Sequence, residues 1–499
     1  MGRVSECPAT ITGMRAAFLA SAVLASLLTP AAPAEAASTG SPGAAGPAGT
    51  ASTAGTTVRA CSGRVSDFDG DGRADLAVAA PYTRVGGHAR AGSVTVLYGT
   101  RAGKQLSQDS PGVPGEAETG DGFGSALAAG DFDGDGCADL AVGVSEEDRS
   151  RVGADGDGIV QLFHGSPDGL RPGRTIDAGD LGRKRGPARF GAALAAGDLD
   201  GDGDDELVIG APGLRGGAVG VYGLKGRRPY MVTQETGWVG QNERETDQFG
   251  AVLATGDFDG DGRAEIAAGA PADTILKNGQ GSVTVLDVRR RKAALLTQDS
   301  PWITGRAEAW DSFGGALATG DFNADGRDDL AIGVPGEGLT DNQRAMEYGD
   351  GTVDVVYGSR GGLRTATSEA WSQRALKGEP RYFDRFGAAL AAGDLNGDGD
   401  DELVIGVPGE NAVQVLAGTR SGGLTKNHNL LFTGKGGHFG GALATVAGRG
   451  LVVAAPGDGR LTLLRTSVRK GSYPGVRPST AKTLATAREG TLFGYALAR

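Results

Sequence analysis

The chain has 499 residues, a formal net charge of −12, 89 glycines and only 6% aromatic residues. The negative charge argues against nucleic acid as a partner, because a nucleic-acid-binding surface needs a basic face. Abundant glycine with few aromatic residues is typical of many short strands joined by turns and argues against long helices.

The first 36 residues have the features of a secretory signal peptide. Arg15 precedes an apolar run at residues 16–28, and the small-residue stretch after it offers an Ala-x-Ala cleavage site that ends at Ala36. The run is too short for a membrane span. Translation could begin at Met1 or at Met14, which leaves the length of the leader open. We expect a secreted, extracellular protein with no membrane span.

Residues 37–60 are rich in Gly, Ala, Ser and Thr. They carry too little apolar surface to offset the entropy of ordering, so we expect a flexible linker. The repeated part of the chain, residues 61–499, follows directly and forms the expected domain.

An acidic loop recurs six times, 59 to 73 residues apart. Each copy is followed by an apolar strand ending in a Gly-Ala-Pro-like turn, and five are preceded by Phe-Gly and a strand of small residues. A third, alternating strand and a weaker fourth complete each unit. Four strands in a unit of roughly 60 residues are typical of a propeller blade. The loops begin at Asp67, Asp131, Asp198, Asp257, Asp321 and Asp394.

The two ends of the repeat array complement each other. A seventh copy at residues 439–456 has both strands but no acidic loop, whereas the first unit lacks Phe-Gly and its strand. The missing piece stands at the C-terminus, in residues 492–499 (LFGYALAR). Because open sheet edges invite aggregation, the last strand is expected to pair with the first unit. The fold class predicted is therefore all-β: a seven-bladed β-propeller of four-stranded antiparallel blades, closed by the C-terminal strand.

The acidic loops have the chemistry of a calcium site. In the second loop Asp131, Asp133, Asp135 and Asp139 stand at positions one, three, five and nine, with Gly136 at position six. Side chains at alternate positions of a tight loop converge, and converging carboxylates repel one another unless a cation lies between them. Hard oxygen ligands in a flexible loop favour calcium over zinc or copper.

Phe-Gly, the DxDxDG loop and Gly-Ala-Pro together resemble the FG-GAP repeat family, which includes the head propellers of integrin α subunits. The resemblance covers residues 61–499 and implies calcium in the loop between the first two strands of a blade, at up to six sites. The ligands implied come from positions one, three, five, seven (a main-chain carbonyl) and nine. They are Asp67, Asp69, Asp71, Arg73 and Asp75; Asp131, Asp133, Asp135, Cys137 and Asp139; Asp198, Asp200, Asp202, Asp204 and Glu206; Asp257, Asp259, Asp261, Arg263 and Glu265; Asp321, Asn323, Asp325, Arg327 and Asp329; and Asp394, Asn396, Asp398, Asp400 and Glu402.

The loops depart from the family pattern to different degrees. Glutamate at position nine is one methylene longer than aspartate, and asparagine at position three removes a charge, so loops five and six fit least well. EF-hands share the spacing but need a glutamate at position twelve and flanking helices; here position twelve is apolar and belongs to a strand. A simpler alternative stays open, in which a loop is only an acidic turn held by Asx hydrogen bonds.

Cys61 and Cys137 remain after the leader, which would remove Cys7. Both adjoin the first two acidic loops, and export permits oxidation. Two interpretations stay open: a disulfide between neighbouring repeats, or two small buried thiols.

No catalytic motif stands out. His88, His164, His428 and His438 are scattered, and the chain has no HExxH, GxSxG or Walker sequence. We therefore expect a protein that is not an enzyme.

The connections opposite the acidic loops vary in length and carry Trp238, Trp302, Trp310 and Tyr382. These rings either contact a ligand or cap the gaps between blades. The function expected is a monomeric, calcium-binding, integrin-α-like module for cell adhesion that binds an extracellular protein or matrix ligand. The alternatives are a carbohydrate-binding lectin, or an accessory domain of a secreted hydrolase.

Overall fold

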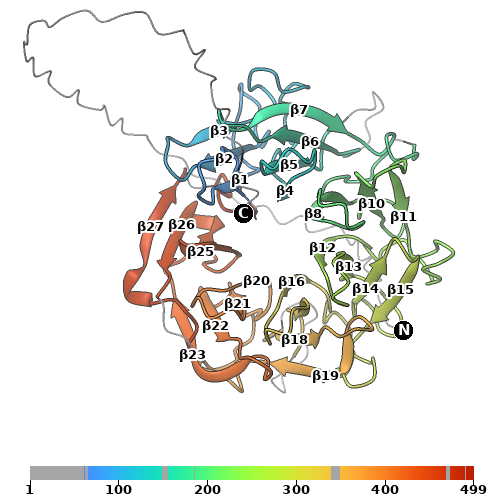
Figure 1. Cartoon of the computed structure of the whole chain (residues 1–499), viewed down its shortest axis with the longest axis vertical. Coiled ribbons are helices and arrows are strands. Elements are labelled where there is room, and N and C mark those ends of the chain that lie inside the picture. The colour runs from blue at the N-terminus through green and yellow to red at the C-terminus, as the bar shows by residue number, and fades with distance from the viewer. Residues whose placement is uncertain are drawn as a thin grey trace, which may run out of the picture.

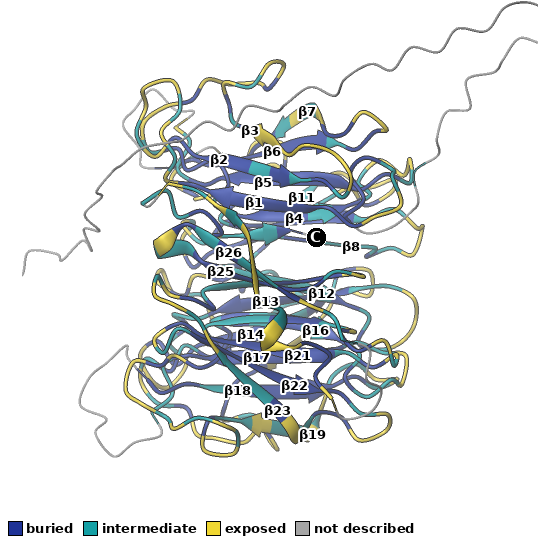
Figure 2. Cartoon of the chain, turned by 90° about the vertical axis from the view of Figure 1, so that its left-hand side faces the viewer, coloured by how far each residue is buried: buried dark blue, intermediate teal, exposed yellow. Residues whose placement is uncertain are grey.

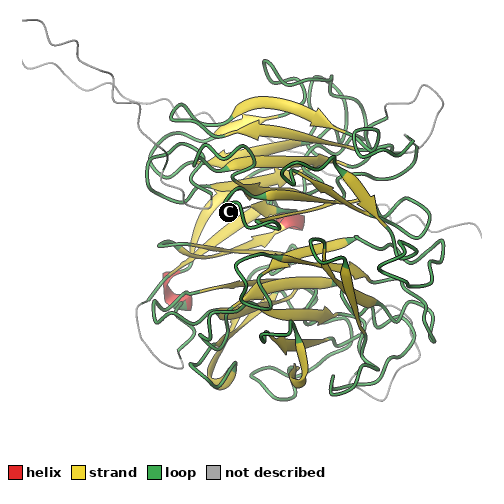
Figure 3. Cartoon of the chain, turned by 45° about the vertical axis from the view of Figure 1, so that its right-hand side comes forward, coloured by secondary structure: helices red, strands yellow, loops and turns green. Residues whose placement is uncertain are grey.

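The computed structural model describes residues 61, 66–148, 156–184, 186–338, 349–467, 473–488 and 490–498. The expected signal peptide (1–36) and linker (37–60) lie outside these residues. Strands and loops make up nearly all of the described chain, with only two short 3-10 helices, η1 (Pro456–Asp458) and η2 (Pro478–Thr480) (Figure 3). Among the described residues, no helix has the length and hydropathy needed to cross a membrane.

The strands form seven antiparallel sheets of four strands each, which we call blades 1 to 7. Within each blade the strands are given from the inner strand to the outer strand. Blade 1 is β28 (Leu497–Ala498), β1 (Leu76–Ala80), β2 (Ser93–Leu97) and β3 (Lys104–Leu106); blade 2 is β4 (Leu127–Gly130), β5 (Asp139–Val144), β6 (Ile159–His164) and β7 (Arg171–Ile176); blade 3 is β8 (Ala193–Gly197), β9 (Glu206–Gly210), β10 (Val219–Tyr222) and β11 (Tyr230–Val232); blade 4 is β12 (Val252–Gly256), β13 (Glu265–Ala270), β14 (Ser282–Asp287) and β15 (Lys292–Leu296). Blade 5 is β16 (Ala316–Gly320), β17 (Asp329–Val334), β18 (Thr352–Tyr357) and β19 (Arg364–Trp371); blade 6 is β20 (Ala389–Gly393), β21 (Glu402–Val407), β22 (Ala412–Ala417) and β23 (Thr425–Thr433); blade 7 is β24 (Ala442–Val446), β25 (Gly450–Ala455), β26 (Arg460–Arg465) and β27 (Lys482–Thr486).

The blades stand around a central axis like the sectors of a disc (Figure 1). Each inner strand contacts the inner strands of the two neighbouring blades, so that the contacts run unbroken around the ring. The predicted seven-bladed propeller is therefore confirmed.

The C-terminal strand closes the ring. β28 pairs with β1 in the register Ala77 to Ala498 and Val78 to Leu497. Just before this strand, the Gly494 amide donates to the Ala79 carbonyl at 2.8 Å. The Phe-Gly pair and inner strand missing from the first repeat are thus supplied by the other end of the chain, as predicted.

The hydrophobic core is divided into seven clusters, one in each gap between neighbouring blades. Successive residues in the second strand of a blade pack into opposite gaps. In blade 3, Leu207 packs toward blade 2 and Val208 packs toward blade 4. This is the period-two alternation of a strand buried on both faces. Figure 2 shows the result, with buried strands inside and exposed residues concentrated in the loops.

The phenylalanine of each Phe-Gly pair is buried at the start of an inner strand. Phe123 is fully buried and forms a bridge with Gly92 of the preceding blade. A Cβ atom on Gly92 would lie 2.3 Å from the Phe123 carbonyl oxygen, so only glycine fits there. The repeated Phe-Gly therefore fixes the contact of one blade with the next.

Candidate metal-binding loops and the opposite face

All six acidic loops lie on one face of the disc, because each precedes the second strand of its blade. The carboxylate at position one organises the loop. Asp131 accepts from the main-chain amides of Gly134 (2.9 Å) and Asp135 (3.2 Å) through Oδ1, and from Gly136 (2.9 Å) through Oδ2. Gly134 and Gly136 both have positive φ, which explains why glycine recurs in these loops. The first aspartates of the other five loops make the same bonds to the amides at positions five and six.

The acid at position nine is buried and ties the loop to its own blade. Asp139 accepts from the Phe132 amide at 3.1 Å and from the Gly165 amide, at the end of the third strand, at 2.8 Å. Burial is the largest cause of a raised pKa at this position in all six loops, and nearby carboxylates add to it. The pKa rises to about 6 for Asp139, about 7 for Asp75 and Glu206, about 8 for Glu265 and Asp329, and about 9 for Glu402.

In at least four loops the structure brings three carboxylates close enough to share one cation, with ligand atoms within 4.8 Å of one another. The donors are all hard carboxylate oxygens, and in loops three and four the group includes the buried acid at position nine, whose ionised form a cation would stabilise. Both features fit Ca²⁺. The groups are Asp67, Asp69 and Asp71; Asp131, Asp133 and Asp135; Asp198, Asp200 and Glu206; and Asp257, Asp259 and Glu265.

Loops five and six are arranged differently. The Asn323 side-chain nitrogen lies 3.4 and 3.3 Å from the two carboxylate oxygens of Asp329, and the Asn396 nitrogen donates to Glu402 Oε1 at 2.8 Å. In these loops an amide N–H group faces the acid at position nine, which in loops three and four belongs to the carboxylate group that could share a cation. A bound cation would have to displace this hydrogen bond, so these two loops fit a cation least well.

At position seven the structure shows a main-chain amide that donates to the carboxylate at position five. The carbonyl ligand predicted there stays a prediction. The donors are Arg73, Cys137, Asp204, Arg263, Arg327 and Asp400, at 2.8 to 3.4 Å from Asp71, Asp135, Asp202, Asp261, Asp325 and Asp398.

Basic side chains reach into several loops, and the sequence did not reveal them. His164 Nδ1 lies 3.0 Å from Asp133 and 3.3 Å from Asp139, and Arg101 Nε lies 2.9 Å from Asp69. His164 is the last residue of β6, directly before the glycine whose amide binds the acid at position nine. In the sequence, the position of His164 at the end of the third strand could have indicated this contact.

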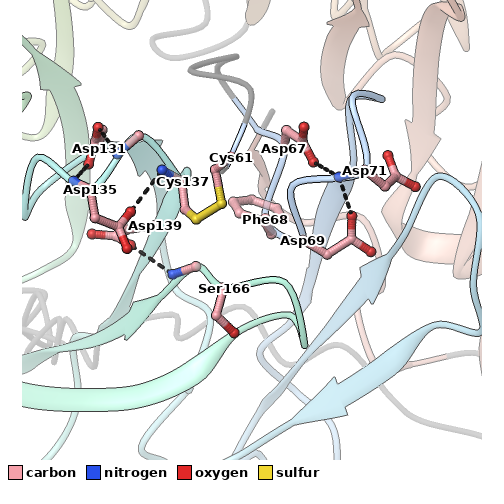
Figure 4. The surroundings of a disulfide bond; sticks show 12 residues. Cys61, Asp67, Phe68, Asp69, Asp71, Asp131, Asp135, Cys137, Asp139 and Ser166 are labelled. Atoms are coloured by element: carbon pink, nitrogen blue, oxygen red, sulfur yellow. Dashed lines mark hydrogen bonds between the residues drawn. A yellow bond between two sulfur atoms is a disulfide. The ribbon is translucent and has the colours of Figure 1, made fainter. Parts of the chain in front are cut away.

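Cys61 and Cys137 form a disulfide, which decides between the two interpretations left open by the sequence. The bond joins the segment before the first acidic loop to position seven of the second loop (Figure 4). The cross-link therefore holds two neighbouring candidate metal loops together.

A second link between loops was missed. In three loops an aspartate at position eight binds the main chain of the first aspartate in the preceding loop. Asp205 accepts from the Asp131 amide at 3.0 Å, while its own amide donates to the Asp131 carbonyl at 2.8 Å. Asp328 does the same with Asp257, and Asp401 with Asp321. In the sequence, the additional aspartate directly before position nine could have indicated this link.

The aromatic residues of the opposite face have different roles. Trp238 packs on the cluster between blades 3 and 4, and the Trp310 ring lies against Gly279 with its indole nitrogen buried. Both fit the interpretation that tryptophan caps a gap between blades. Trp302, by contrast, is 74% exposed, and Tyr382 is 39% exposed and contacts Phe383 edge-on. These two face solvent.

A set of buried acids on this face also escaped notice. An aspartate stands two residues before four of the Phe-Gly pairs and accepts from the main-chain amide three residues earlier. Burial is the largest cause of a raised pKa in all four. They are Asp121, Asp247, Asp311 and Asp384. In the sequence, the repeated spacing Asp-x-Phe-Gly could have indicated this set of acids.

The ring and its acidic loops define a seven-bladed β-propeller with candidate cation sites on one face. An FG-GAP repeat model matches residues 123–163, 190–223, 249–286, 313–356 and 386–424, and an FG-GAP-like repeat model matches residues 67–142. The chain belongs to the FG-GAP repeat family.

Two relatives are similar to part of this chain. The chain is 33% identical over 233 residues to integrin alpha pat-2 of Caenorhabditis briggsae, covering 44% of this chain and 18% of the relative. It is 27% identical over 372 residues to human phosphatidylinositol-glycan-specific phospholipase D, covering 69% of this chain and 42% of the relative. The matched region is thus less than half of each relative.

A solved structure described as a putative 6-phosphogluconolactonase from Bacteroides fragilis aligns with a TM-score of 0.44 and 13% identity. The alignment covers 85% of this chain and 97% of that one.

Proposed function

We propose that this protein is a secreted, calcium-stabilised and non-catalytic binding module that engages an extracellular protein through the face opposite the acidic loops. The residue pattern of the leader supports export, and the four carboxylate groups described above support calcium. The integrin and phospholipase relatives support an extracellular setting, although the match covers only part of each.

One observation carries the choice of face. Among the described residues ten large hydrophobic side chains are exposed, and seven of them lie in connections opposite the acidic loops. Exposed aromatic residues on rigid connections are typical anchors of protein interfaces. The seven are Tyr82, Ile275, Leu276, Trp302, Tyr382, Phe383 and Tyr495, while Leu295, Tyr473 and Leu484 lie elsewhere.

The test is binding of the mature protein to a panel of purified extracellular matrix proteins, measured by biolayer interferometry in calcium. A Tyr382→Ser, Phe383→Ser double variant should bind its target at least about tenfold more weakly. Leu484→Ser, on the outer strand β27, is the matched control and should bind normally. Equal binding by both variants, or no binding to any matrix protein, would contradict the proposal.

A second candidate is a lectin, and the exposure of Trp302 favours it, because a free indole face suits sugar stacking. A glycan array compares the wild-type protein with Trp302→Ala, and Trp310→Ala serves as a control that alters packing instead. Loss of a glycan signal in Trp302→Ala alone would favour the lectin over the protein-binding module.

An accessory role beside a secreted hydrolase is a third candidate. This candidate function is supported by the similarity to a phospholipase D over 69% of this chain. Turnover of a phospholipid or polysaccharide by the purified chain itself would contradict the non-catalytic part of the proposal.

A further inference from the structure

Two hairpin turns at the outer rim concentrate positive charge on an acidic protein. The turn between β10 and β11 carries Lys225, Arg227 and Arg228, and the turn between β14 and β15 carries Arg289, Arg290 and Arg291. They belong to neighbouring blades, 3 and 4. Six basic residues on two adjacent turns contrast with the net charge of −12 of the whole chain.

Some of these charges already have partners. Lys225 Nζ lies 3.1 Å from Asp202, and Arg290 lies 2.9 Å from Asp259 and 3.0 Å from Asp287. Both side chains therefore belong to the acidic loops. In the part of the chain that the structure describes, no carboxylate lies within ion-pair distance of Arg227, Arg228 or Arg291.

Those same three arginines line one pocket between blades 3 and 4. The pocket has a volume of about 680 Å³, and its remaining lining residues are Tyr230, Trp238 and Val288. Arg227 and Arg291 both lie near the Tyr230 hydroxyl, where their charges oppose the rise in its pKa that burial causes. The volume falls within the range of small-ligand sites.

The pocket therefore combines a positively charged part with an apolar and aromatic part, and each can recognise a different part of one ligand. Guanidinium groups bind tetrahedral oxyanions through paired N–H donors, and three uncompensated positive charges in one cavity repel each other unless an anion is present. The Tyr230 and Trp238 rings and the apolar Val288 provide a surface for a flat apolar body. We propose that this pocket binds an aryl phosphate or aryl sulfate ester, with the ester oxygens at the arginines and the ring against Tyr230 and Trp238.

An acidic peptide strand would fit less well. Strand addition needs a long free sheet edge, and the outer strand of blade 3, β11, has only three residues. Nucleic acid needs a basic surface much larger than one pocket. The pocket lining includes none of the seven exposed side chains proposed for protein binding, so either assignment can fail without the other.

The test uses phenyl phosphate and phenyl sulfate as probes, titrated into the full chain at low ionic strength and followed by ligand-observed NMR. Inorganic phosphate, inorganic sulfate and phenol are the comparison compounds. A fragment of this size should bind with a dissociation constant on the order of a millimolar. At least one ester should bind about tenfold more tightly than its inorganic anion and than phenol, and the two arms show whether phosphate or sulfate is preferred.

An Arg227→Ala, Arg291→Ala double variant should weaken ester binding at least about tenfold. Both residues are exposed, so the fold should persist, as an unchanged thermal melt would verify. Arg289→Ala, in the same turn but outside the pocket lining, is the matched control and should change binding less than about twofold. Esters that bind no better than inorganic anions, or binding that survives the double variant, would overturn the assignment.

Discussion

The Asp205 carboxylate accepts a hydrogen bond from the Asp131 amide at 3.0 Å, and thereby joins the acidic loop of blade 3 to that of blade 2. The return bond, from the Asp205 amide to the Asp131 carbonyl, measures 2.8 Å. Asp131 also organises its own loop, so one residue takes part in both the candidate metal site and the contact between blades. Loop order and blade packing are therefore coupled on this face.

Asp205→Ala should lower the free energy of unfolding by about 1 to 2 kcal/mol, because it leaves the Asp131 amide without its side-chain acceptor. Alanine fits this position: Ala264 stands there in the next loop, and its amide still donates to the Asp198 carbonyl. Urea denaturation in calcium provides the measurement. Asp168→Ala, at a highly exposed aspartate, is the control, and equal stability of both variants would contradict this role.

Calcium should stabilise the protein, because an ion that binds only the native state adds stability with the logarithm of its free concentration. Chelation should lower the melting temperature by several degrees. Asp131→Ala should reduce the calcium-dependent rise in melting temperature, whereas Asn396→Ala should change it little. A melt that is the same with calcium and with chelator would contradict calcium binding.

The sixth loop allows the opposite test. Asn396→Asp replaces the amide that faces Glu402 with a second carboxylate. The two acids should repel in chelator and share a cation in calcium. The variant should therefore be less stable than wild type without calcium and show a larger calcium-dependent rise in melting temperature. A rise equal to that of wild type would show that this loop binds no metal even with the charge restored.

The disulfide should contribute substantially to stability. Its two cysteines are separated by 76 residues, and a loop of this length predicts about 4.5 kcal/mol in the chain-entropy model. A Cys61→Ser, Cys137→Ser double variant should lose stability on this scale in urea denaturation, and a reducing agent should affect wild type but not the variant. Two reactive thiols in the unreduced native protein, detected by alkylation and mass spectrometry, would contradict the bond.

Ring closure predicts the effect of a short C-terminal deletion. Removing residues 492–499 takes away β28 and Phe493, and leaves the β1 edge open. We expect a lower melting temperature and association through the free edge, measured by light scattering after size exclusion. Removing Arg499 alone keeps β28 and is the control. A truncated chain that stays monomeric and equally stable would contradict closure by this strand.

The repeated features of the molecule could be predicted because repetition makes local patterns visible. Phe-Gly, the acidic loop and the period-two strands recur, so the blades and the unmatched inner strand of blade 1 follow from the sequence. The acid at position one also behaves as its spacing suggests, since its partners lie within five residues.

The features that could not be predicted depend on distances between blades or between distant strands. Asp205 and Asp131 are 74 residues apart, and His164 reaches Asp139 only because the two strands pair. The roles of the tryptophans were undecided for the same reason. Trp310 turns inward against Gly279 while Trp302 faces solvent, although both stand in the same connection.

Asp354 is a buried acid whose surroundings were invisible to the sequence. It lies on the third strand of blade 5, opposite Ile332, and is 1% exposed. In the described residues neither of its carboxylate oxygens has a hydrogen-bond partner. Burial first, and then the charge of Glu337, raise the pKa of Asp354 well above its ordinary value. Burial likewise raises the pKa of Glu337, to about 7.

These shifts predict how stability depends on pH. An unfolded chain releases the aspartate proton near pH 4, whereas the native protein retains it to higher pH. Above about pH 4 the native state therefore binds more protons, and its stability falls as pH rises. Asp354→Asn keeps the shape but cannot ionise, so it should be more stable than wild type by about 1 to 3 kcal/mol near pH 8 and nearly equal near pH 4. Urea denaturation across this pH range, with calcium held constant, measures the difference in the free energy of unfolding. Asp168→Asn, at an exposed aspartate, is the control. Parallel curves of stability against pH for Asp354→Asn and wild type would rule out ionisation of Asp354 as the cause.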